Sequence, residues 1–257
     1  MNTLTDYRTE TDSIGEKHIP KNVYYGVQSL RAAENFHITG LNMHPEIISS
    51  LACIKKAAAI TNCEINLLDK KRADAIDKAC NEILEGKHFE DFIVDPIQGG
   101  AGTSLNMNAN EVIANRAIEI LGGKKGDYSI VHPNDHVNCS QSTNDVIPTA
   151  GKMTSLKLLL KLKSELLRLH SALSSKAEEF NHVIKMGRTQ MQDAVPIRLG
   201  QEFGAYAAAI MRDIHRMDTA MNEMRSLNMG GTAIGTGINA DEAYLSRIVP
   251  NISEVSS

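Results

Sequence analysis

Two long segments with apolar residues at every third or fourth position constrain the fold more than any other feature of the sequence. The first runs from Leu156 to Phe180 and the second from Leu199 to Met224. That spacing places the apolar side chains on one face of an α-helix. Each segment corresponds to roughly 40 Å of helix at about 1.5 Å per residue. Helices of this length exceed what a small domain needs, so we expect a helical bundle shared between subunits.

The composition agrees with a helical fold. The chain has 257 residues, enough to bury a sizeable core, and a formal net charge of -4. Aromatic residues make up 4% of it, tryptophan is absent, and leucine, isoleucine, alanine and 11 methionines supply the apolar mass. That profile favours packing of helix on helix over a β-sandwich. The balanced charge indicates neither nucleic acid nor a membrane surface as a partner.

The sequence carries no visible signal for export or membrane insertion. The first residues lack a basic region followed by an apolar run, and no stretch reaches the roughly 18 apolar residues of a membrane span. Cys53, Cys63, Cys80 and Cys139 have no CxxC spacing, so neither a zinc knuckle nor a redox pair is indicated. We expect a soluble, cytoplasmic protein with reduced thiols.

Shorter helices are predicted before the two long ones. Pro45 and Asp69 suit the starts of two helices, the second of which stops at Gly86. A third helix is predicted over about residues 111–122. Residues 1–44 contain turn signals and little periodicity, which predicts an extended, loop-rich arm.

A polar stretch, HPNDHVNCSQSTNDVIPTA at residues 132–150, stands just before the first long helix. Its short polar side chains make little sense inside a core, because each buried polar group needs a hydrogen-bond partner. Pro133 and Pro148 punctuate it and disfavour a helix. The stretch is predicted to be either a loop that presents hydrogen-bond donors at the mouth of the bundle or a solvated surface loop.

Two further polar clusters lie at residues 95–110 and 185–196. The first is rich in glycine, which lets a backbone turn sharply or approach a ligand closely; a connector without a ligand is the alternative. It is not a GxGxxG motif after a strand, and no Walker lysine follows, so nucleotide binding has little support. Near the end of the chain, residues 230–237 form either a tight packed turn or a loop that carries donors.

The polar clusters contain no recognisable nucleophile or metal site. No GxSxG elbow occurs, and no Cys–His pair has a known context. His132 and His136 are separated by Pro133 and lack an evident third ligand, so no metal is expected. What the clusters share is neutral donors, which suit a small dianionic substrate whose negative charge grows during reaction. These donors are Thr103, Ser104, Asn106, Asn108, Asn138, Ser142, Thr143, Asn144, Thr189 and Gln190.

Several segments resemble the aspartase/fumarase superfamily. GAGTSLNMNANEV at residues 100–112 is similar to its first signature region, and VHPNDHVNCSQSTNDVIPTA at residues 131–150 to its second. GRTQMQDAVPIRLGQEF at residues 187–203 resembles a third segment that contributes to the site. YYGVQSLRAAENF and GGTAIGTGINA match as well, so the resemblance covers essentially the whole chain. GAGTS and Gln190 resemble the aspartate ammonia-lyases, whereas fumarases typically have histidine in place of Gln190.

The resemblance implies a mainly α fold of aspartase/fumarase type. A loop-rich and helical N-terminal lyase domain would cover residues 1–141, and the first part of a long central helical bundle would cover residues 142–257. The resemblance also implies a homotetramer whose active sites are assembled from three subunits, with no cofactor. The implied reaction is the reversible elimination of ammonia from L-aspartate to give fumarate, through removal of a Cβ proton and an aci-carboxylate intermediate.

Roles for individual residues also follow from the resemblance. Thr103, Ser142 and Thr143 would bind the β-carboxylate, Thr189 the α-carboxylate, and Asn144 with Gln190 the amino group. In the superfamily the base is a serine on a flexible GSS-type loop, and no GSSxMPxKxN motif occurs in these 257 residues. We therefore expect a truncated chain that has no catalytic base of its own and is inactive alone.

Two alternatives stay open. A class II fumarate hydratase has the same fold and base, and it would hydrate fumarate without any dependence on ammonia. A non-catalytic helical protein would use the bundle only for assembly. The missing base loop favours this last interpretation for the chain alone, whereas the donor clusters favour an enzyme. Truncation would leave the long apolar stripes exposed, because their partner helices would be absent.

Overall fold

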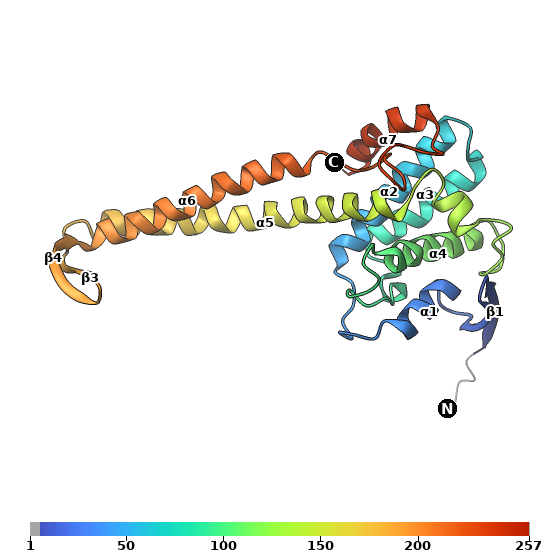
Figure 1. Ribbon diagram of the computed structural model, residues 1–257, viewed down its shortest axis with the longest axis horizontal. Coiled ribbons are helices and arrows are strands. Elements are labelled where there is room, and N and C mark those ends of the chain that lie inside the picture. Colours follow the sequence, from blue (N-terminus) through green and yellow to red (C-terminus); the bar gives the residue numbers. More distant parts are fainter. Residues whose placement is uncertain (1–5, 257) are drawn as a thin grey trace. The chain divides into compact units, whose positions relative to one another are not determined.

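The computed structural model describes residues 6–256 and is mainly helical, which confirms the expected fold class (Figure 1). Its elements are, in chain order, β1 (Tyr7–Asp12), β2 (Gly15–Pro20), α1 (Val27–Asn35), α2 (Pro45–Glu64), α3 (Lys70–Leu84), the 3₁₀ turn η1 (Phe89–Asp91), α4 (Thr103–Ile120), the π-helical turn η2 (Pro133–Val137), α5 (Thr143–Glu179), β3 (Ile184–Thr189), β4 (Gln192–Arg198), α6 (Leu199–Met224) and α7 (Glu242–Val255).

These elements belong to two compact units. The first contains the residues up to Thr154 and those from Leu227 onward, and the second contains Ser155–Ser226. Each unit has one antiparallel two-stranded sheet, β1–β2 in the first and β3–β4 in the second. The division between a lyase domain and a bundle after residue 141 stays a prediction.

The core of the first unit is formed by helices α2, α3, α4 and α7. Ile54, Ile76, Ile113 and Ile248, one from each helix, have no exposed surface. Burying one such side chain stabilises the fold by about 1.5–3 kcal/mol. Segments far apart in the sequence therefore depend on each other: α7, near the end of the chain, packs against α2.

The starts of α2 and α3 are as predicted. Pro45 is the first residue of α2, where its missing N–H removes no intrahelical hydrogen bond. Asp69 caps α3, and its carboxylate accepts a hydrogen bond from the backbone N–H of Arg72 at 3.0 Å. Helix α7 was not predicted, although Asp241 caps it in the same way, accepting from the N–H of Ala243 at 2.7 Å.

The N-terminal arm contains more regular structure than predicted, namely the hairpin β1–β2 and helix α1. A buried carboxylate of α4 holds this arm in place. Glu111 accepts hydrogen bonds from the backbone N–H groups of Gly26, Gln28 and Ser29 at 2.9, 2.9 and 3.0 Å. A carboxylate at a helix N-terminus satisfies donors that have no intrahelical partner and complements the helix dipole. The start of α1 therefore lies against α4.

The glycine-rich cluster at residues 95–110 is a loop only in its first half. Helix α4 starts at Thr103, so the predicted start at about Glu111 was wrong. Asparagine has a low helix propensity, but tertiary contacts outweigh it here. Asn108 is fully buried and donates a hydrogen bond to the backbone carbonyl of Asp91 at 2.9 Å.

The polar stretch at residues 132–150 is not one loop either, and that prediction was wrong for most of its length. Residues 133–137 form η2, and α5 begins at Thr143 and continues through Pro148. Proline removes one backbone hydrogen bond from a helix. In a helix of 37 residues that loss is small beside the remaining bonds. Residues 138–142 alone connect the two helical segments.

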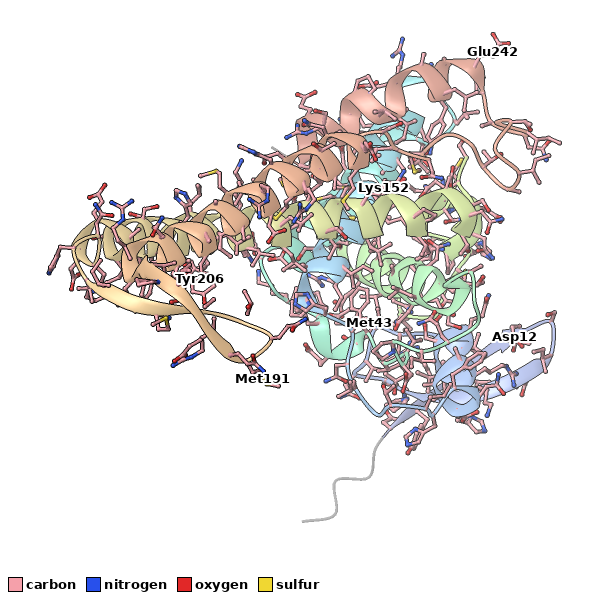
Figure 2. All side chains as sticks on the ribbon, turned by 60° about the vertical axis from the view of Figure 1, so that its left-hand side comes forward. Asp12, Met43, Lys152, Met191, Tyr206 and Glu242 are labelled. Carbon is pink, nitrogen blue, oxygen red and sulfur yellow. The ribbon has the colours of Figure 1, made fainter. Side chains whose placement is uncertain are left out.

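The second unit consists of α5 from residue 155, the β3–β4 hairpin and α6, with the two helices side by side in Figure 1. Lys163 and Asp218 form an ion pair between them at 2.6 Å. Gly200 permits a close approach between them, because a Cβ atom there would lie 2.2 Å from the carbonyl oxygen of Ala177. At the hairpin turn, Met191 is 97% exposed (Figure 2).

The apolar stripe of α5 is only partly covered. Leu160 and Leu162 are 58% and 48% exposed, and no residue of α5 from 155 to 179 is fully buried. Among the described residues no helix combines the length and the hydropathy needed to cross a membrane.

An ion pair between α3 and α4 makes stability depend on pH. Glu82 accepts two hydrogen bonds from Arg116, at 2.5 and 2.8 Å, and a third links it to His88 at 3.0 Å. The Arg116 guanidinium lowers the pKa of Glu82 to about 2, against the opposing effect of burial and with a further contribution from His88. A carboxylate whose pKa is lower in the folded state stabilises the fold above its unfolded pKa.

We therefore expect the stabilisation from Glu82 to be complete above about pH 5 and to be lost as the pH falls from about 4.5 towards 2. The variant Glu82→Gln should lower the free energy of unfolding at pH 7 and flatten its pH dependence below pH 5, as measured by urea unfolding. Glu90→Gln, at an exposed position, is the control. An unchanged acid slope in Glu82→Gln would contradict this assignment.

Candidate active site

Three of the predicted site residues, Thr103, Ser142 and Thr143, line one cavity of about 590 Å³ in the first unit. Thr103 is the first residue of α4 and Thr143 the first residue of α5. The N-terminus of a helix carries a partial positive charge and N–H groups without intrahelical partners, so two such termini at one cavity favour an anion. The other lining residues are Gln28, Asn106, Met107, Asn134, Asn138, Ser140, Gln141, Thr232, Ala233, Ile238 and Asn239.

The start of α5 is held by reciprocal capping. The hydroxyl of Ser142 accepts a hydrogen bond from the backbone N–H of Asn144 at 3.2 Å, and the carboxylate of Asp145 accepts one from the N–H of Ser142 at 2.9 Å. Residues 142–145, S-T-N-D, therefore resemble a capping box, with Asp in place of the usual Glu and with the Ser142 hydroxyl bonded to the N–H of the second helical residue instead of the third. This capping turns the hydroxyl-bearing residues 142 and 143 towards the cavity.

The same carboxylate fixes the opposite wall of the cavity. The second oxygen of Asp145 accepts hydrogen bonds from the backbone N–H groups of Gly230 and Thr232, at 3.2 and 3.0 Å. Thr232 has a φ of +55°, a conformation that is costly for a β-branched residue, and its hydroxyl donates to the carbonyl of Ile238 at 3.1 Å. Asp145 is 1% exposed. One buried carboxylate thus joins α5 to the loop at residues 228–240.

The start of α4 is held by the loop that precedes it. The side chain of Gln98 accepts a hydrogen bond from the N–H of Leu105 at 2.7 Å and donates one to the carbonyl of Asp95 at 2.8 Å. Gly102 precedes the helix with a φ of +75°, in the left-handed region that favours glycine. The glycine-rich loop therefore positions Thr103 at the cavity.

The two histidines of the stretch serve the π-helical turn. Nδ1 of His132 accepts hydrogen bonds from the N–H groups of Asn134 and Asp135, both at 3.2 Å, and Nδ1 of His136 accepts one from the N–H of His132 at 2.8 Å. Within residues 6–256 no three His, Cys, Asp or Glu side chains are grouped so as to hold a metal ion.

Beneath the cavity lies a lysine that the sequence analysis missed. Lys55, on α2, is completely buried, and its Nζ donates hydrogen bonds to Oδ1 of Asn106, Oδ1 of Asn138 and Oε1 of Gln141 at 2.8, 2.8 and 3.0 Å. Burial lowers the pKa of Lys55 to about 7, against the opposing effect of the Asp145 carboxylate. None of the residues that line the cavity carries a charge. Lys55 thus places an ionisable amine in direct contact with three of the lining residues.

Asn106 and Asn138, two more of the predicted donors, also line this cavity, whereas Ser104, Asn108, Asn144, Thr189 and Gln190 do not. Asn144 is exposed at the start of α5, and its Nδ2 donates a hydrogen bond to the carbonyl of Ala233 at 2.8 Å. Asn108 belongs to the core and is no ligand donor. Thr189 and Gln190 lie in the second unit, exposed at the end of β3 and in the hairpin turn. Gln190 has a φ of +50°, an uncommon conformation for a residue other than glycine.

Some of the missed residues have a signal in the sequence. Lys55 stands in the run LACIKKAAAI, where its neighbours at helical spacing are apolar, so a buried lysine was a reasonable candidate. The capping box S-T-N-D was equally visible. Gln28 and Thr232 lie in segments that were noted for their family resemblance, and residues 230–237 were considered as a loop that carries donors. The sequence did not indicate that these segments reach the same cavity as the starts of α4 and α5.

The comparisons with known proteins agree with one another. A family model described as "Lyase" matches residues 15–257. An aspartate ammonia-lyase from Bacillus subtilis (strain 168) is 56% identical over 256 residues, which are 100% of this chain and 54% of that protein. A class II fumarate hydratase from Halobacterium salinarum is 48% identical over 97% of this chain and 53% of its own length.

Solved structures give the same result for the fold. A fumarate lyase:delta crystallin from Brucella melitensis bound to cobalt superposes with a TM-score of 0.95 at 49% sequence identity. The match covers 98% of this chain and 55% of that one. The chain thus spans about half the length of the relatives that it matches.

The double role of Asp145 predicts a local effect of its substitution. An amide in its place offers one acceptor oxygen and turns its NH₂ group towards backbone donors. Asp145→Asn should therefore destabilise the fold by about 2 kcal/mol. It should also speed hydrogen exchange at the amides of Ser142, Gly230 and Thr232. Asp135→Asn, at an exposed position of η2, is the control. Unchanged exchange at Gly230 and Thr232 would show that the carboxylate does not hold the loop.

Proposed function

Because this chain belongs to the lyase family of the aspartate ammonia-lyases and class II fumarate hydratases, we propose that it takes part in the reversible elimination of ammonia from L-aspartate to give fumarate. One structural observation carries the proposal. Two helix N-termini and the hydroxyl groups of Thr103, Ser142 and Thr143 converge on a cavity whose lining has no charge. Such a cavity suits a small carboxylate.

The three hydroxyl groups would bind the β-carboxylate of the substrate. Removal of the Cβ proton converts this group into an aci-carboxylate with an additional negative charge. Donors that are already in place lower the barrier, because they are oriented before the charge develops; one such donor contributes roughly 3–4 kcal/mol. The N-termini of α4 and α5 add to this stabilisation.

The remaining contacts are proposed from the resemblance. Thr189 would bind the α-carboxylate, and Asn144 with Gln190 would hold the amino group. Nδ2 of Asn144 already donates to the carbonyl of Ala233, which leaves its Oδ1 as the acceptor for a substrate ammonium. Exposed leucines such as Leu160 and Leu162 on α5 support the proposal of a homotetramer, because assembly would cover them. A cytoplasmic location belongs to the same proposal.

Proton abstraction is not assigned to this chain. The cavity lining contains no carboxylate, imidazole or amine that could accept the Cβ proton. The hydroxyls of its two serines are engaged in the structure: Ser140 donates to Asn62, and Ser142 caps α5 by accepting from the N–H of Asn144. In the superfamily the base serine lies on a GSS-type loop, and the sequence has no such motif. We therefore propose that this chain binds the substrate and stabilises the developing charge, and that the base is supplied from outside it.

A second candidate function is the hydration of fumarate. The 48% identity to the class II fumarate hydratase of Halobacterium salinarum supports it. The same carboxylate contacts and the same intermediate would serve both reactions, since water takes the place of ammonia. The glutamine at position 190 is the residue type expected of aspartate ammonia-lyases, whereas fumarases typically have histidine there, and this favours elimination of ammonia.

The proposal can be tested by complementation. The chain is assayed alone and mixed with the C-terminal part of the Bacillus subtilis aspartate ammonia-lyase that it does not match, by ultraviolet absorbance of fumarate formed from L-aspartate. We expect activity only in the mixture and none from the chain by itself. Formation of malate from fumarate without ammonia would favour the hydratase instead. Absence of both reactions would favour a non-catalytic assembly protein.

The variant Thr143→Ala tests the role of the carboxylate donors. In the complemented mixture we expect kcat to fall about 100- to 1000-fold, because one preorganised donor to the developing charge is lost. The midpoint of thermal unfolding should change little, since Thr143 is only partly buried. Thr219→Ala, on the exposed side of α6, is the matched control. A loss of stability without a loss of kcat would exclude this role for Thr143.

A further inference from the structure

Lys55 combines complete burial with a purely neutral set of partners. It has no exposed surface, and among the described residues no carboxylate forms an ion pair with it. Burying a charge without a partner of opposite charge is unfavourable, so lysine is seldom found fully buried unless it is paired. A feature this costly to the fold calls for a role other than packing.

The geometry around Nζ fits the charged form of the side chain. The three acceptor oxygens, from Asn106, Asn138 and Gln141, lie at 2.8, 2.8 and 3.0 Å. An ammonium has three N–H donors, whereas a neutral amine has two. Three acceptors and no donor around Nζ therefore match a lysine that holds its proton.

The lysine also decides which way the amides face. Because an ammonium can only donate, each amide must turn its oxygen towards the charged Nζ and its NH₂ group away. Nδ2 of Asn106 then donates to Oγ1 of Thr143 at 3.3 Å. Since Oγ1 of Thr143 already accepts a hydrogen bond, its own hydrogen is left to donate to a ligand in the cavity. A chain of hydrogen bonds thus runs from Lys55 through Asn106 to Thr143.

Few other ionisable groups act on Lys55. Among residues 6–256, Asp145 on α5 is the one carboxylate with a resolved electrostatic effect on it, and both of its oxygens already accept backbone hydrogen bonds. The thiol of Cys80 on α3 also faces it, and burial raises the pKa of Cys80, which keeps that thiol neutral. The partners from α4 and from residues 138–141 are amides. A dianion in the cavity would be the main new charge near Lys55.

We propose that Lys55 is a positioning residue for a four-carbon dicarboxylate: its buried ammonium orients Asn106, Asn138 and Gln141, makes Thr143 a donor, and supplies the positive charge that the cavity lining lacks. The inference deepens the proposed function and rests on it. Lys55 does not touch the substrate; it acts through the amides and Thr143.

Proton uptake on binding follows from this role. Burial lowers the pKa of Lys55 to about 7, so most of the free protein has a neutral lysine at pH 8. A bound dianion favours the ammonium and raises this pKa, because opposite charges stabilise each other. Binding at pH 8 should therefore take up a fraction of a proton, and affinity should fall as the pH rises from about 6.5 to 9.

Calorimetric titration with succinate, a dicarboxylate that cannot eliminate ammonia, tests the proposal on the chain itself. Runs at pH 8 in buffers of different ionisation enthalpy measure the protons taken up. Lys55→Met should weaken succinate binding about 10- to 100-fold and abolish both proton uptake and pH dependence. Lys55→Arg keeps a charge that does not titrate in this range; it should restore part of the affinity without proton uptake.

The neighbouring lysine provides the matched control. Lys56 pairs with Asp77 at 3.3 Å and does not line this cavity, so Lys56→Met should bind succinate with unchanged affinity and pH dependence. If Lys55→Met does not fold, the measurement of proton uptake by the unaltered chain still tests the proposal. Binding of succinate without proton uptake would overturn the role of Lys55 but would not contradict the proposed function. Absence of any succinate binding by the unaltered chain would contradict the proposed function as well.

Discussion

The carboxylate of Asp145 connects the parts of the molecule that form the candidate site. One oxygen accepts the N–H of Ser142 and the other accepts those of Gly230 and Thr232. The start of α5 and the loop before α7 are therefore fixed by one side chain that is 1% exposed. Backbone donors that are buried need partners, and within the described part of the chain no other acceptor is hydrogen-bonded to these three. The shape of the cavity depends on this interaction.

The electrostatic design of the cavity follows from where its charges lie. The lining is neutral, and positive potential comes from the N-termini of α4 and α5 and from Lys55 beneath, offset in part by the buried carboxylate of Asp145 in the first turn of α5. Charges placed behind a neutral lining attract an anion without forming a direct ion pair with it. A direct ion pair would stabilise the bound substrate as strongly as the transition state. Such an arrangement suits a reaction in which negative charge increases on the substrate.

Much of the fold was predictable from local patterns. The starts of α2 and α3 at Pro45 and after Asp69 depend on residues within one helical turn, and the stripe of α6 is a repeat within one segment. The polar stretches were mispredicted as loops, since propensity disfavours helix at Asn108 and Pro148. Burial and distant partners such as the carbonyl of Asp91 outweigh propensity there.

The sequence by itself determined the helical class, the family resemblance, and Thr103, Ser142 and Thr143 as candidate donors, because these follow from composition, periodicity and motifs along the chain. The tertiary structure alone decided that these donors share one cavity and that Lys55 lies beneath it. The hydrogen bond from Lys55 to Asn138 joins residues 83 positions apart. Local patterns carry no information on such a pairing, because it exists only once α2 and the segment before α5 have packed around a common core.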